Sequence, residues 1–282
     1  MKLSELRGAA SDILAGGSEE RPLYVVDVIL ARKLGISKSL LIVNMDEEIT
    51  LGQCREILSM VERRAAGEPL SYILGEAEFY GRVFKVGRGV LIPRPETELL
   101  TEEMIKRARD GDVFADWCTG SGCIGATILL ETERTKCFGV DSSPEALAWT
   151  RQNIKRYYLS DRFALLQNGN PLDFGFTSSF FDFIVANPPY IPSEQLALVM
   201  RDVIDFEPIE ALDGGEGGIA LYQKFFTIFP RILKPGGYFG CETAGDVQSA
   251  KLQAIAPAEF RLEQKIYDYK GILRHLIWQK RI

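Results

Sequence analysis

The sequence predicts a two-part α/β protein in which a small helical module precedes a doubly wound parallel sheet. In residues 1–75 the apolar residues recur at the three- and four-residue spacing that amphipathic helices require. From residue 112 onward, strand-like apolar runs alternate with helical segments, an order typical of a parallel sheet covered by helices. Residues 76–93 switch to the period of two that predicts a hairpin linker, so the second domain is expected to span 94–282.

The individual elements follow from local signals. Thr50 fits the N-cap of a helix in the first part, and Gly81 lies at the centre of the expected hairpin. Pro95 fits the first turn of a helix, where the missing N–H has no intrahelical partner anyway. The segment 190–218 is the longest irregular connection, a kind of loop that often carries function. We expect strands in 112–118, 135–141, 163–167, 181–188 and 236–243, helices in 125–133, 144–158 and 218–233, and two last strands in 261–279.

Composition and charge exclude several classes of protein. The 282 residues carry a formal net charge of −6 with a pI near 5.1, which disfavours a long DNA- or RNA-binding surface. Five scattered cysteines and a single histidine indicate neither a disulfide framework nor a zinc site. No apolar stretch approaches the roughly 20 residues that span a bilayer, and the N-terminus has no signal-type apolar core. We expect a reduced, metal-free, cytoplasmic monomer that does not bind a membrane.

A glycine-rich loop follows the first strand of the predicted sheet. Gly120, Gly122 and Gly125 satisfy G-x-G-x-x-G, and Asp141 follows about 20 positions later, at the end of the next strand. Glycines let the backbone approach a ligand, and a carboxylate at that place can accept protons from both ribose hydroxyls. The pattern predicts a cofactor that contains a nucleoside, and a nicotinamide dinucleotide is one candidate. A tight turn that binds no ligand is the alternative. Asp116 ahead of the glycines favours S-adenosylmethionine, held through backbone groups and water.

A second motif, Asn187-Pro188-Pro189-Tyr190, ends the fourth strand of the alternating region. The carboxyl ends of parallel strands share one edge, so this motif and the glycine loop are expected to share one cleft. The prolines remove two N–H donors and leave carbonyl acceptors beside the Asn187 side-chain oxygen. Two acceptors can grip a planar NH2 group and turn its nitrogen lone pair toward a sulfonium methyl, while Tyr190 packs on the substrate. The motif predicts methyl transfer to nitrogen, with a rigid turn as the alternative.

Longer stretches resemble the HemK/PrmC family of class I methyltransferases. The resemblance is carried by "LIPRPETE" and the linker before it, by "DWCTGSGCIG", by "VDSSPEALAWTRQN" and by "IVANPPYI". The NPPY motif alone is shared with adenine and cytosine amino-methyltransferases, whereas "LIPRPETE" is far more specific. The resemblance implies a Rossmann-like, seven-stranded methyltransferase domain with an antiparallel last strand, and an N-terminal helical domain that grips the substrate. It also implies methylation of the glutamine side-chain nitrogen in the Gly-Gly-Gln loop of peptide chain release factors.

The same resemblance assigns residues to the site. Asn187, with Pro188, Pro189 and Tyr190, would hold the substrate amide, and Asn187 would also lie beside the cofactor. Asp141 and the adjacent Ser142 would hold the ribose of S-adenosylmethionine. Asn170 would lie beside the adenine. The methionine end of the cofactor would lie against Asp116, Cys118, Thr119, Gly120, Ser121 and Gly122.

Four positions depart from the family's pattern. Cys118 stands where glycine is usual, so the backbone there must tolerate a Cβ. The stretch "QNGNP" at 167–171 lacks the acidic residue that often follows the third strand. Gly217 replaces a common aspartate, and the spacing from Glu242 to Gln248 is one residue longer than usual. None of these departures removes a residue of the expected chemistry.

Other residues have two interpretations each. Arg94 and Glu96 fit either a supporting position near the cofactor or a capping ion pair at the start of a helix. His275 lies in an alternating apolar stretch, which indicates a strand residue with a satisfied ring. Three aromatics of the linker are expected to pack the hairpin onto the sheet, with a wall of the methyl pocket as the alternative: Phe79, Tyr80 and Phe84.

The leading prediction is an S-adenosylmethionine-dependent protein-glutamine methyltransferase that acts on release factors and makes no direct contact with nucleic acid. Glutamine methylation of a ribosomal protein is a close alternative. A nucleic-acid amino-methyltransferase should carry a basic stripe or a target-recognition insertion, and the sequence contains neither. A nicotinamide-dependent dehydrogenase and a scaffold without activity also stay open, the first because of G-x-G-x-x-G and the second because of the departures from the pattern.

Overall fold

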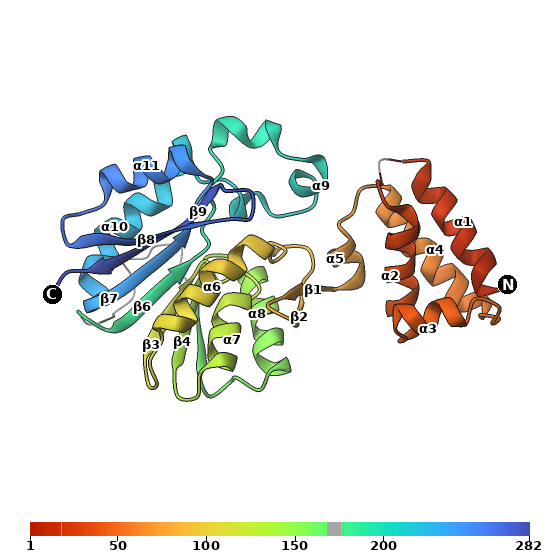
Figure 1. Cartoon of the computed structure of the whole chain (residues 1–282), viewed down its shortest axis with the longest axis horizontal. Helices are drawn as coiled ribbons and strands as arrows, with labels where there is room; N and C mark the ends of the chain where they lie inside the picture. The colour runs from red at the N-terminus through yellow and green to blue at the C-terminus, as the bar shows by residue number, and fades with distance from the viewer. Residues whose placement is uncertain (18, 168–175, 177) are drawn as a thin grey trace. The chain divides into compact units, whose positions relative to one another are not determined.

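The computed structural model describes residues 1–17, 19–167, 176 and 178–282. The chain divides into two compact units (Figure 1). The first unit comprises Met1–Glu76 and Met200–Phe206, and the second comprises Ala77–Val199 and Glu207–Ile282. The segment from Met200 to Phe206 lies far along the sequence from the other residues of the first unit, and nothing in the local pattern indicated that it belongs there.

The first unit is a helical module with one apolar core. Leu6, Ile29 and Ile57 are fully buried in it, each on a different helix. Thr50 is an N-cap as expected, because its hydroxyl accepts a hydrogen bond from Gln53 N while the Gln53 side chain accepts one from Thr50 N. The helices are α1 (Leu3–Ala15), α2 (Pro22–Leu34), α3 (Lys38–Val43), α4 (Leu51–Ala65), α5 (Leu70–Leu74) and the short α9 (Arg201–Ile204).

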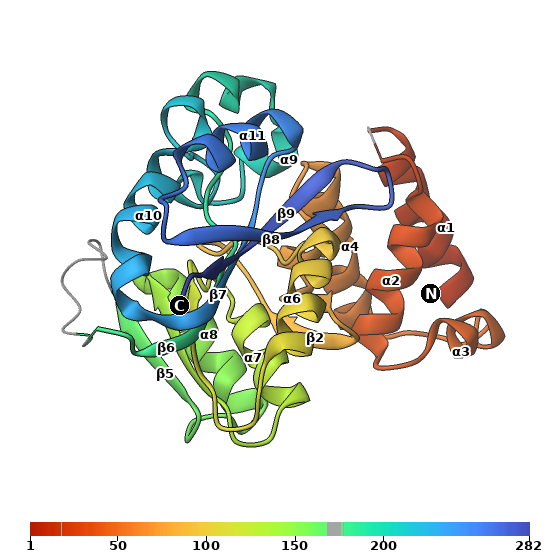
Figure 2. The ribbon, with the colours of Figure 1, turned by 60° about the vertical axis from the view of Figure 1, so that its left-hand side comes forward.

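A seven-stranded sheet forms the centre of the second unit, in the order β5-β4-β3-β6-β7-β9-β8 (Figure 2). The strands from β5 to β7 in this order pair in parallel, and β9 is antiparallel to both of its neighbours, as the resemblance implied. The predicted hairpin forms a separate two-stranded sheet. The strands are β1 (Glu76–Phe79), β2 (Arg82–Lys85), β3 (Val113–Trp117), β4 (Lys136–Asp141), β5 (Phe163–Gln167), β6 (Phe181–Ala186), β7 (Leu233–Glu242), β8 (Phe260–Tyr267) and β9 (Leu273–Lys280).

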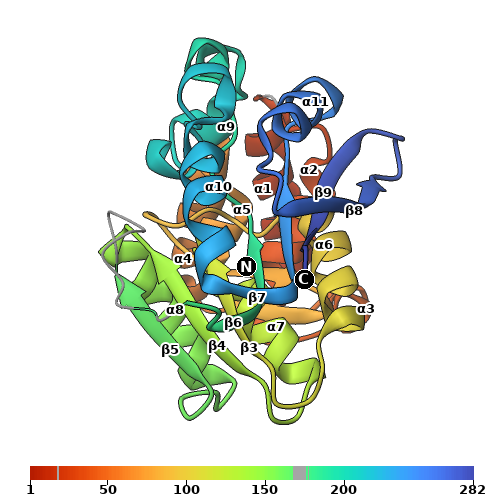
Figure 3. The ribbon, with the colours of Figure 1, turned by 90° about the vertical axis from the view of Figure 1, so that its left-hand side faces the viewer.

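Helices cover both faces of this sheet, and α6 and α10 lie on opposite sides of the strands (Figure 3). Phe114 packs into one apolar core and its neighbour Ala115 into the other, since successive strand residues point to opposite faces. One core is completed by α6 (Pro95–Arg107), α7 (Cys123–Glu131) and α8 (Pro144–Arg156), and the other by α10 (Ala220–Ile232) and α11 (Asp246–Ile255). The α/β class predicted from the alternating segments is confirmed.

The helix α11 was not predicted. It buries Gln248 and Ser249 beside Leu252, and these polar residues interrupt the apolar spacing that marks an amphipathic helix. The Gln248 side chain donates hydrogen bonds to the carbonyl oxygens of Tyr190 and Gly218, at 2.8 and 2.9 Å. The buried glutamine therefore anchors the segment that leaves β6, in spite of its unusual spacing from Glu242.

The connection from β6 to α10 is irregular, as expected. Besides α9 it contains three 3₁₀ turns, η1 (Ser193–Leu198), η2 (Ile209–Ala211) and η3 (Glu216–Gly218). Ile191 N donates to Leu212 O at 3.0 Å, and Gly214 N donates to Ile191 O at 2.8 Å, so the two ends of this connection are tied to each other. In the part of the chain that the structure describes, no helix is both long and apolar enough to cross a membrane.

Candidate functional site

The carboxyl ends of three parallel strands bring the two sequence motifs together. In the register of the sheet, Trp117 of β3 pairs with Val140 of β4 on one side and with Ala186 of β6 on the other. The next residue of each strand emerges at the same edge of the sheet, where ligands of open α/β folds bind. These residues are Cys118, Asp141 and Asn187, and all of them line one cavity of about 560 Å³.

Most of the predicted site residues face this cavity. Its lining includes Cys118, Thr119, Gly120, Ser121, Asp141, Ser142, Asn187 and Pro189. The linker also contributes, through Gly89, Val90, Leu91, Pro93 and Arg94, which the sequence analysis did not assign to a pocket wall as a group. Of the predicted residues that the structure describes, Asp116, Gly122, Pro188 and Tyr190 are not in the lining. Asn170 lies outside the described residues.

The glycine loop owes its path to backbone conformations that side chains disfavour. Gly120 and Gly122 have φ of +57° and +78°. A Cβ at Gly122 would lie 2.5 Å from Thr150 Cγ2, so α8 leaves no room for a side chain there. Cys118 also has a positive φ, of +61°, in the left-handed region that favours glycine. The chain tolerates a Cβ at this position at the expense of backbone strain, which gives a physical reason why glycine is usual there.

Asp116 stabilises the glycine loop through hydrogen bonds from a buried position. Its side chain is fully buried, and its Oδ2 accepts hydrogen bonds from Thr119 Oγ1 at 2.6 Å and from Gly125 N at 3.0 Å. Burial raises the pKa of this carboxyl to about 7, although these two bonds act in the opposite direction. The position of Asp116 outside the lining favours a role in holding the loop over direct contact with a ligand.

Asp141 fixes the opposite side of the loop. Its Oδ2 accepts from Gly120 N at 2.9 Å, and its Oδ1 accepts from Ser143 N at 3.0 Å. Burial raises the pKa of Asp141 above its ordinary value. Each carboxylate oxygen can accept a further hydrogen bond, so Asp141 remains able to bind hydroxyl groups of a ligand in the cavity.

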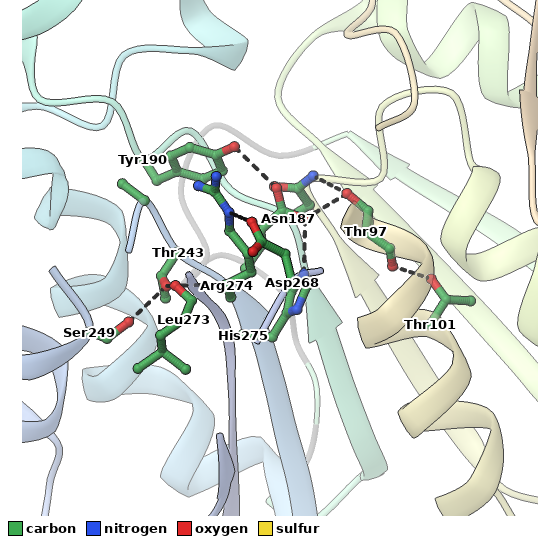
Figure 4. A network of polar contacts seen from close by, with 12 residues as sticks. Thr97, Thr101, Asn187, Tyr190, Thr243, Ser249, Asp268, Leu273, Arg274 and His275 are labelled. Atoms are coloured by element: carbon green, nitrogen blue, oxygen red, sulfur yellow. Dashed lines mark hydrogen bonds and ion pairs between the residues drawn. The ribbon is translucent and has the colours of Figure 1, made fainter. Parts of the chain in front are cut away.

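The other end of the cavity is organised by side chains (Figure 4). Asn187 Nδ2 donates to Thr97 Oγ1 at 3.1 Å, and Thr97 Oγ1 donates to Glu242 Oε2 at 2.5 Å. The Tyr190 hydroxyl donates to Glu242 Oε1 at 3.1 Å. His275 Nε2 lies 3.3 Å from Glu242 Oε2. Asn187 Oδ1 is buried and has no hydrogen-bond partner among the described residues, so it is an acceptor available to a ligand.

The shifted pKa values in this network favour a protonated Tyr190 and an ionised Glu242. Burial raises the pKa of Tyr190, as does the negative charge of Glu242, so the phenol stays protonated and donates. Burial also opposes ionisation of Glu242, but contacts with His275, Thr97 and Tyr190 outweigh it, and the pKa of Glu242 lies below its ordinary value. Glu242 is therefore a buried carboxylate that only accepts hydrogen bonds.

Sequence reasoning missed Thr97 and the role of Glu242. Thr97 lies three positions beyond Arg94 on the first turn of α6, and Glu242 ends β7, yet neither position carries a local motif for hydrogen bonding to Asn187. His275 was predicted as a strand residue with a satisfied ring. It is fully buried on β9, but only Nε2 has a partner in the described part of the chain, while Nδ1 has none.

The remaining interpretations are decided by packing. Arg94 pairs with the buried Glu207 at 2.5 Å and faces the cavity, which supports a position near the site over an ion pair with Glu96. Phe79 and Phe84 are fully buried in the core beneath α6 and α7, with their ring centroids 6.2 Å apart. Neither ring is in the cavity lining, so these aromatics pack the hairpin onto the sheet, as expected.

The fold and the two motifs at the strand ends define the class of protein. Residues 95–215 match a family model described as the methyltransferase small domain. The chain also resembles the crystal structure of a methyltransferase from Pyrococcus furiosus, with a TM-score of 0.54 and 17% identity, over 72% of this chain and 91% of that one. The chain is thus a methyltransferase by fold.

Curated relatives identify the family. Release factor glutamine methyltransferases are 38% identical over 83% of this chain in Thermodesulfovibrio yellowstonii and 35% identical over 96% in Moorella thermoacetica, covering 84% and 96% of those proteins. The relative in Koribacter versatilis is 36% identical over 99% of both chains. Residues 5–75 match the PrmC N-terminal domain. The chain belongs to the release factor glutamine methyltransferase family.

Proposed function

We propose that this protein transfers a methyl group from S-adenosylmethionine to the side-chain amide nitrogen of the glutamine in the Gly-Gly-Gln motif of peptide chain release factors. The observation that carries this proposal is the buried, unpartnered Oδ1 of Asn187 in the lining of the cavity that also contains the glycine loop. Family membership supports the same substrate, because the relatives bear the name of this reaction.

The chain's residues fit S-adenosylmethionine at the glycine-loop end of the cavity. Cys118, Thr119, Gly120 and Ser121 line this end of the cavity, and a glycine loop lets backbone groups approach the amino-acid end of the cofactor. Asp141, with both oxygens already placed by backbone N–H groups, would accept protons from the ribose hydroxyls, with Ser142 beside it. The volume of about 560 Å³ lies within the range of small-molecule and cofactor sites. The cofactor supplies an electrophilic sulfonium methyl group.

The chain's own part in the reaction is to bind and orient the glutamine amide. Asn187 Oδ1 would accept one hydrogen of the substrate NH2, and the carbonyl of Pro188, in a segment whose prolines offer no N–H donor, would accept the other. These two acceptors would direct the nitrogen lone pair toward the methyl group, so most of the rate enhancement would come from orientation. Tyr190 is held by Glu242 and does not line the cavity in this structure, so its ring would pack against the amide plane only after the substrate has bound. The substrate proton would leave after methylation, without a dedicated base.

The partner in this proposal is a protein. The N-terminal helical unit would dock the release factor, and the second unit would carry out the transfer, with the protein acting as a cytoplasmic monomer that needs no direct contact with nucleic acid. The net charge of −6 supports a protein substrate over a phosphate backbone. The irregular connection after β6 begins with the NPPY segment and so lies next to the place where the Gly-Gly-Gln loop would bind.

The test is transfer of labelled methyl from S-adenosylmethionine to a purified release factor, compared with the same factor after its Gly-Gly-Gln glutamine is changed to alanine. We expect label only on the intact factor, and mass spectrometry should place one methyl group on the glutamine side chain. Label on both factors would contradict the proposed site. If calorimetry detects cofactor binding but neither factor is labelled, ribosomal proteins and nucleic acids should be tried as substrates in the same assay.

A further inference from the structure

We infer that Thr97 and Glu242 are positioning residues that set which way round the side-chain amide of Asn187 lies. This inference rests on the proposed function, because the orientation matters only if Asn187 Oδ1 accepts a hydrogen bond from a substrate NH2 group. Thr97 lies on the first turn of α6 and Glu242 at the end of β7, so two elements far apart in the sequence would decide the chemistry that the NPPY motif presents.

The argument begins with the proton of the Thr97 hydroxyl. Thr97 Oγ1 lies 2.5 Å from Glu242 Oε2, and a carboxylate can only accept, so the single hydroxyl hydrogen of Thr97 points to Glu242. Thr97 Oγ1 can then only accept from its other neighbour, the Asn187 side chain, at 3.1 Å. The group that faces Thr97 must therefore be the NH2 of Asn187, which leaves the buried Oδ1 as the unused acceptor of a residue that lines the cavity.

The reverse orientation is disfavoured at both ends of the amide. Turned around, Asn187 would place its oxygen against the lone pairs of Thr97 Oγ1, so that two acceptors would face each other without a proton between them. Its NH2 would then point toward the NH2 of the substrate, two donors with no acceptor. An unmade hydrogen bond at a buried group is expensive, so the orientation set by Thr97 favours binding of an NH2 group.

Glu242 can fix the direction of these hydrogen bonds because each of its two carboxylate oxygens has a donor next to it. Tyr190 donates to Oε1, and Oε2 receives Thr97 and lies 3.3 Å from His275 Nε2. If Nε2 carries the histidine proton, the unpartnered Nδ1 is a bare acceptor, which is the less costly atom to leave unpaired. The hydroxyl protons of Thr97 and Tyr190 thus both point toward Glu242, and this buried carboxylate sets the direction of the hydrogen bond between Thr97 and Asn187.

The experiment compares variants of Thr97 with a control on the same helix. Thr97→Val keeps the shape and removes the hydroxyl, whereas Thr97→Ser keeps the hydroxyl. Thr101→Val is the matched control, because Thr101 is also fully buried on α6 and its hydroxyl donates only to the Thr97 backbone oxygen, at 2.9 Å, among the described residues. Each variant is assayed for kcat and KM with the release factor and for cofactor affinity by calorimetry.

We expect Thr97→Val to lower kcat by about 10- to 100-fold, from the loss of one oriented hydrogen bond, without changing cofactor affinity. Thr97→Ser and Thr101→Val should stay close to the wild type. Glu242→Gln, which offers one acceptor oxygen in place of two, should resemble Thr97→Val. Equal turnover in Thr97→Val and Thr101→Val, or a loss in Thr97→Ser as large as in Thr97→Val, would overturn the inference.

A second measurement separates this inference from the proposed function. Hydrogen exchange of the Asn187 side-chain NH2, followed by NMR in protein labelled at asparagine, does not depend on the substrate. We expect slow exchange in the wild type and in Thr101→Val, and faster exchange in Thr97→Val. Absence of methyl transfer by the wild type would count against the proposed function alone. Unchanged exchange in Thr97→Val would count against the positioning role, whatever the substrate.

Discussion

The two ends of the cavity are built in different ways. At the cofactor end the shape comes from backbone, in a loop of successive residues whose path is set by Gly120 and Gly122 and by a strained Cys118. At the substrate end it comes from side chains, where Asn187 is held by Thr97, 90 positions away, and through Thr97 by Glu242. The first end is thus fixed mostly by local conformation, and the second by contacts that exist only in the folded domain.

Substitutions at the two ends of the cavity are therefore expected to have different effects. Adding atoms should harm the cofactor end, because close approach of the backbone is what the loop provides. Removing atoms should harm the substrate end, because specific oxygens and protons are what it provides. Cofactor affinity and turnover are therefore expected to respond to different sets of substitutions.

The largest effect is expected for Asn187→Ala. Loss of the acceptor that would orient the substrate amide should lower kcat by about 100- to 1,000-fold, in the range seen when one preorganised group is removed from an active site. Cofactor affinity should stay close to that of the wild type, since the loop is untouched. Steady-state kinetics with the release factor and calorimetry with S-adenosylmethionine measure the two quantities. Lost cofactor binding with normal turnover per bound cofactor would contradict the division between the two ends.

A smaller effect, on stability and cofactor affinity together, is expected for Gly122→Ala. A Cβ there would lie 2.5 Å from Thr150 Cγ2 at a φ of +78°, so the free energy of unfolding should fall by roughly 2–4 kcal/mol. S-adenosylmethionine should also bind more weakly, because the loop must shift. Denaturant unfolding and calorimetry measure both changes.

The control for this variant is Gly111→Ala. Gly111 has a φ of +87°, but no described atom lies within 4 Å of a Cβ placed there. In Gly111→Ala the free energy of unfolding should fall by only about 1 kcal/mol, because alanine is disfavoured in the left-handed backbone conformation, and the cofactor affinity should not change. If both alanine variants lose the same stability and the same affinity, close approach to α8 is not what shapes the loop.

The smallest effect is expected for Cys118→Gly. Glycine relieves the strain of a side chain at φ +61° but adds backbone entropy to the unfolded chain, so the free energy of unfolding should change by less than about 1 kcal/mol. Cofactor affinity should be kept or improved, since the backbone of the loop is what approaches the ligand. A large loss of affinity in calorimetry would show that the cysteine side chain itself takes part in binding.

Much of the site could be predicted because its signals are local. The glycine loop, Asp141 and the NPPY stretch each follow a strand, and parallel strands end at one edge, so their meeting in one cavity followed from the order of elements. The helix α11 could not be predicted in the same way, because Gln248 and Ser249 occupy its buried face. Gln248 is buried there for its hydrogen bonds to the segment after β6, which is a long-range reason.

Local sequence signals were enough to predict the α/β class, the edge of the sheet where the cavity lies, and most of the loop residues that line it. The orientation of those side chains depends on contacts that form only in the folded domain. The sequence does not show which way the side-chain amide of Asn187 is turned. Its orientation depends on the hydrogen bond that the Thr97 hydroxyl donates to Glu242, which leaves Thr97 Oγ1 to accept from the Asn187 NH2 group. Hydrogen-bond direction is set by which atoms meet in three dimensions, and strand and helix patterns carry no information about it.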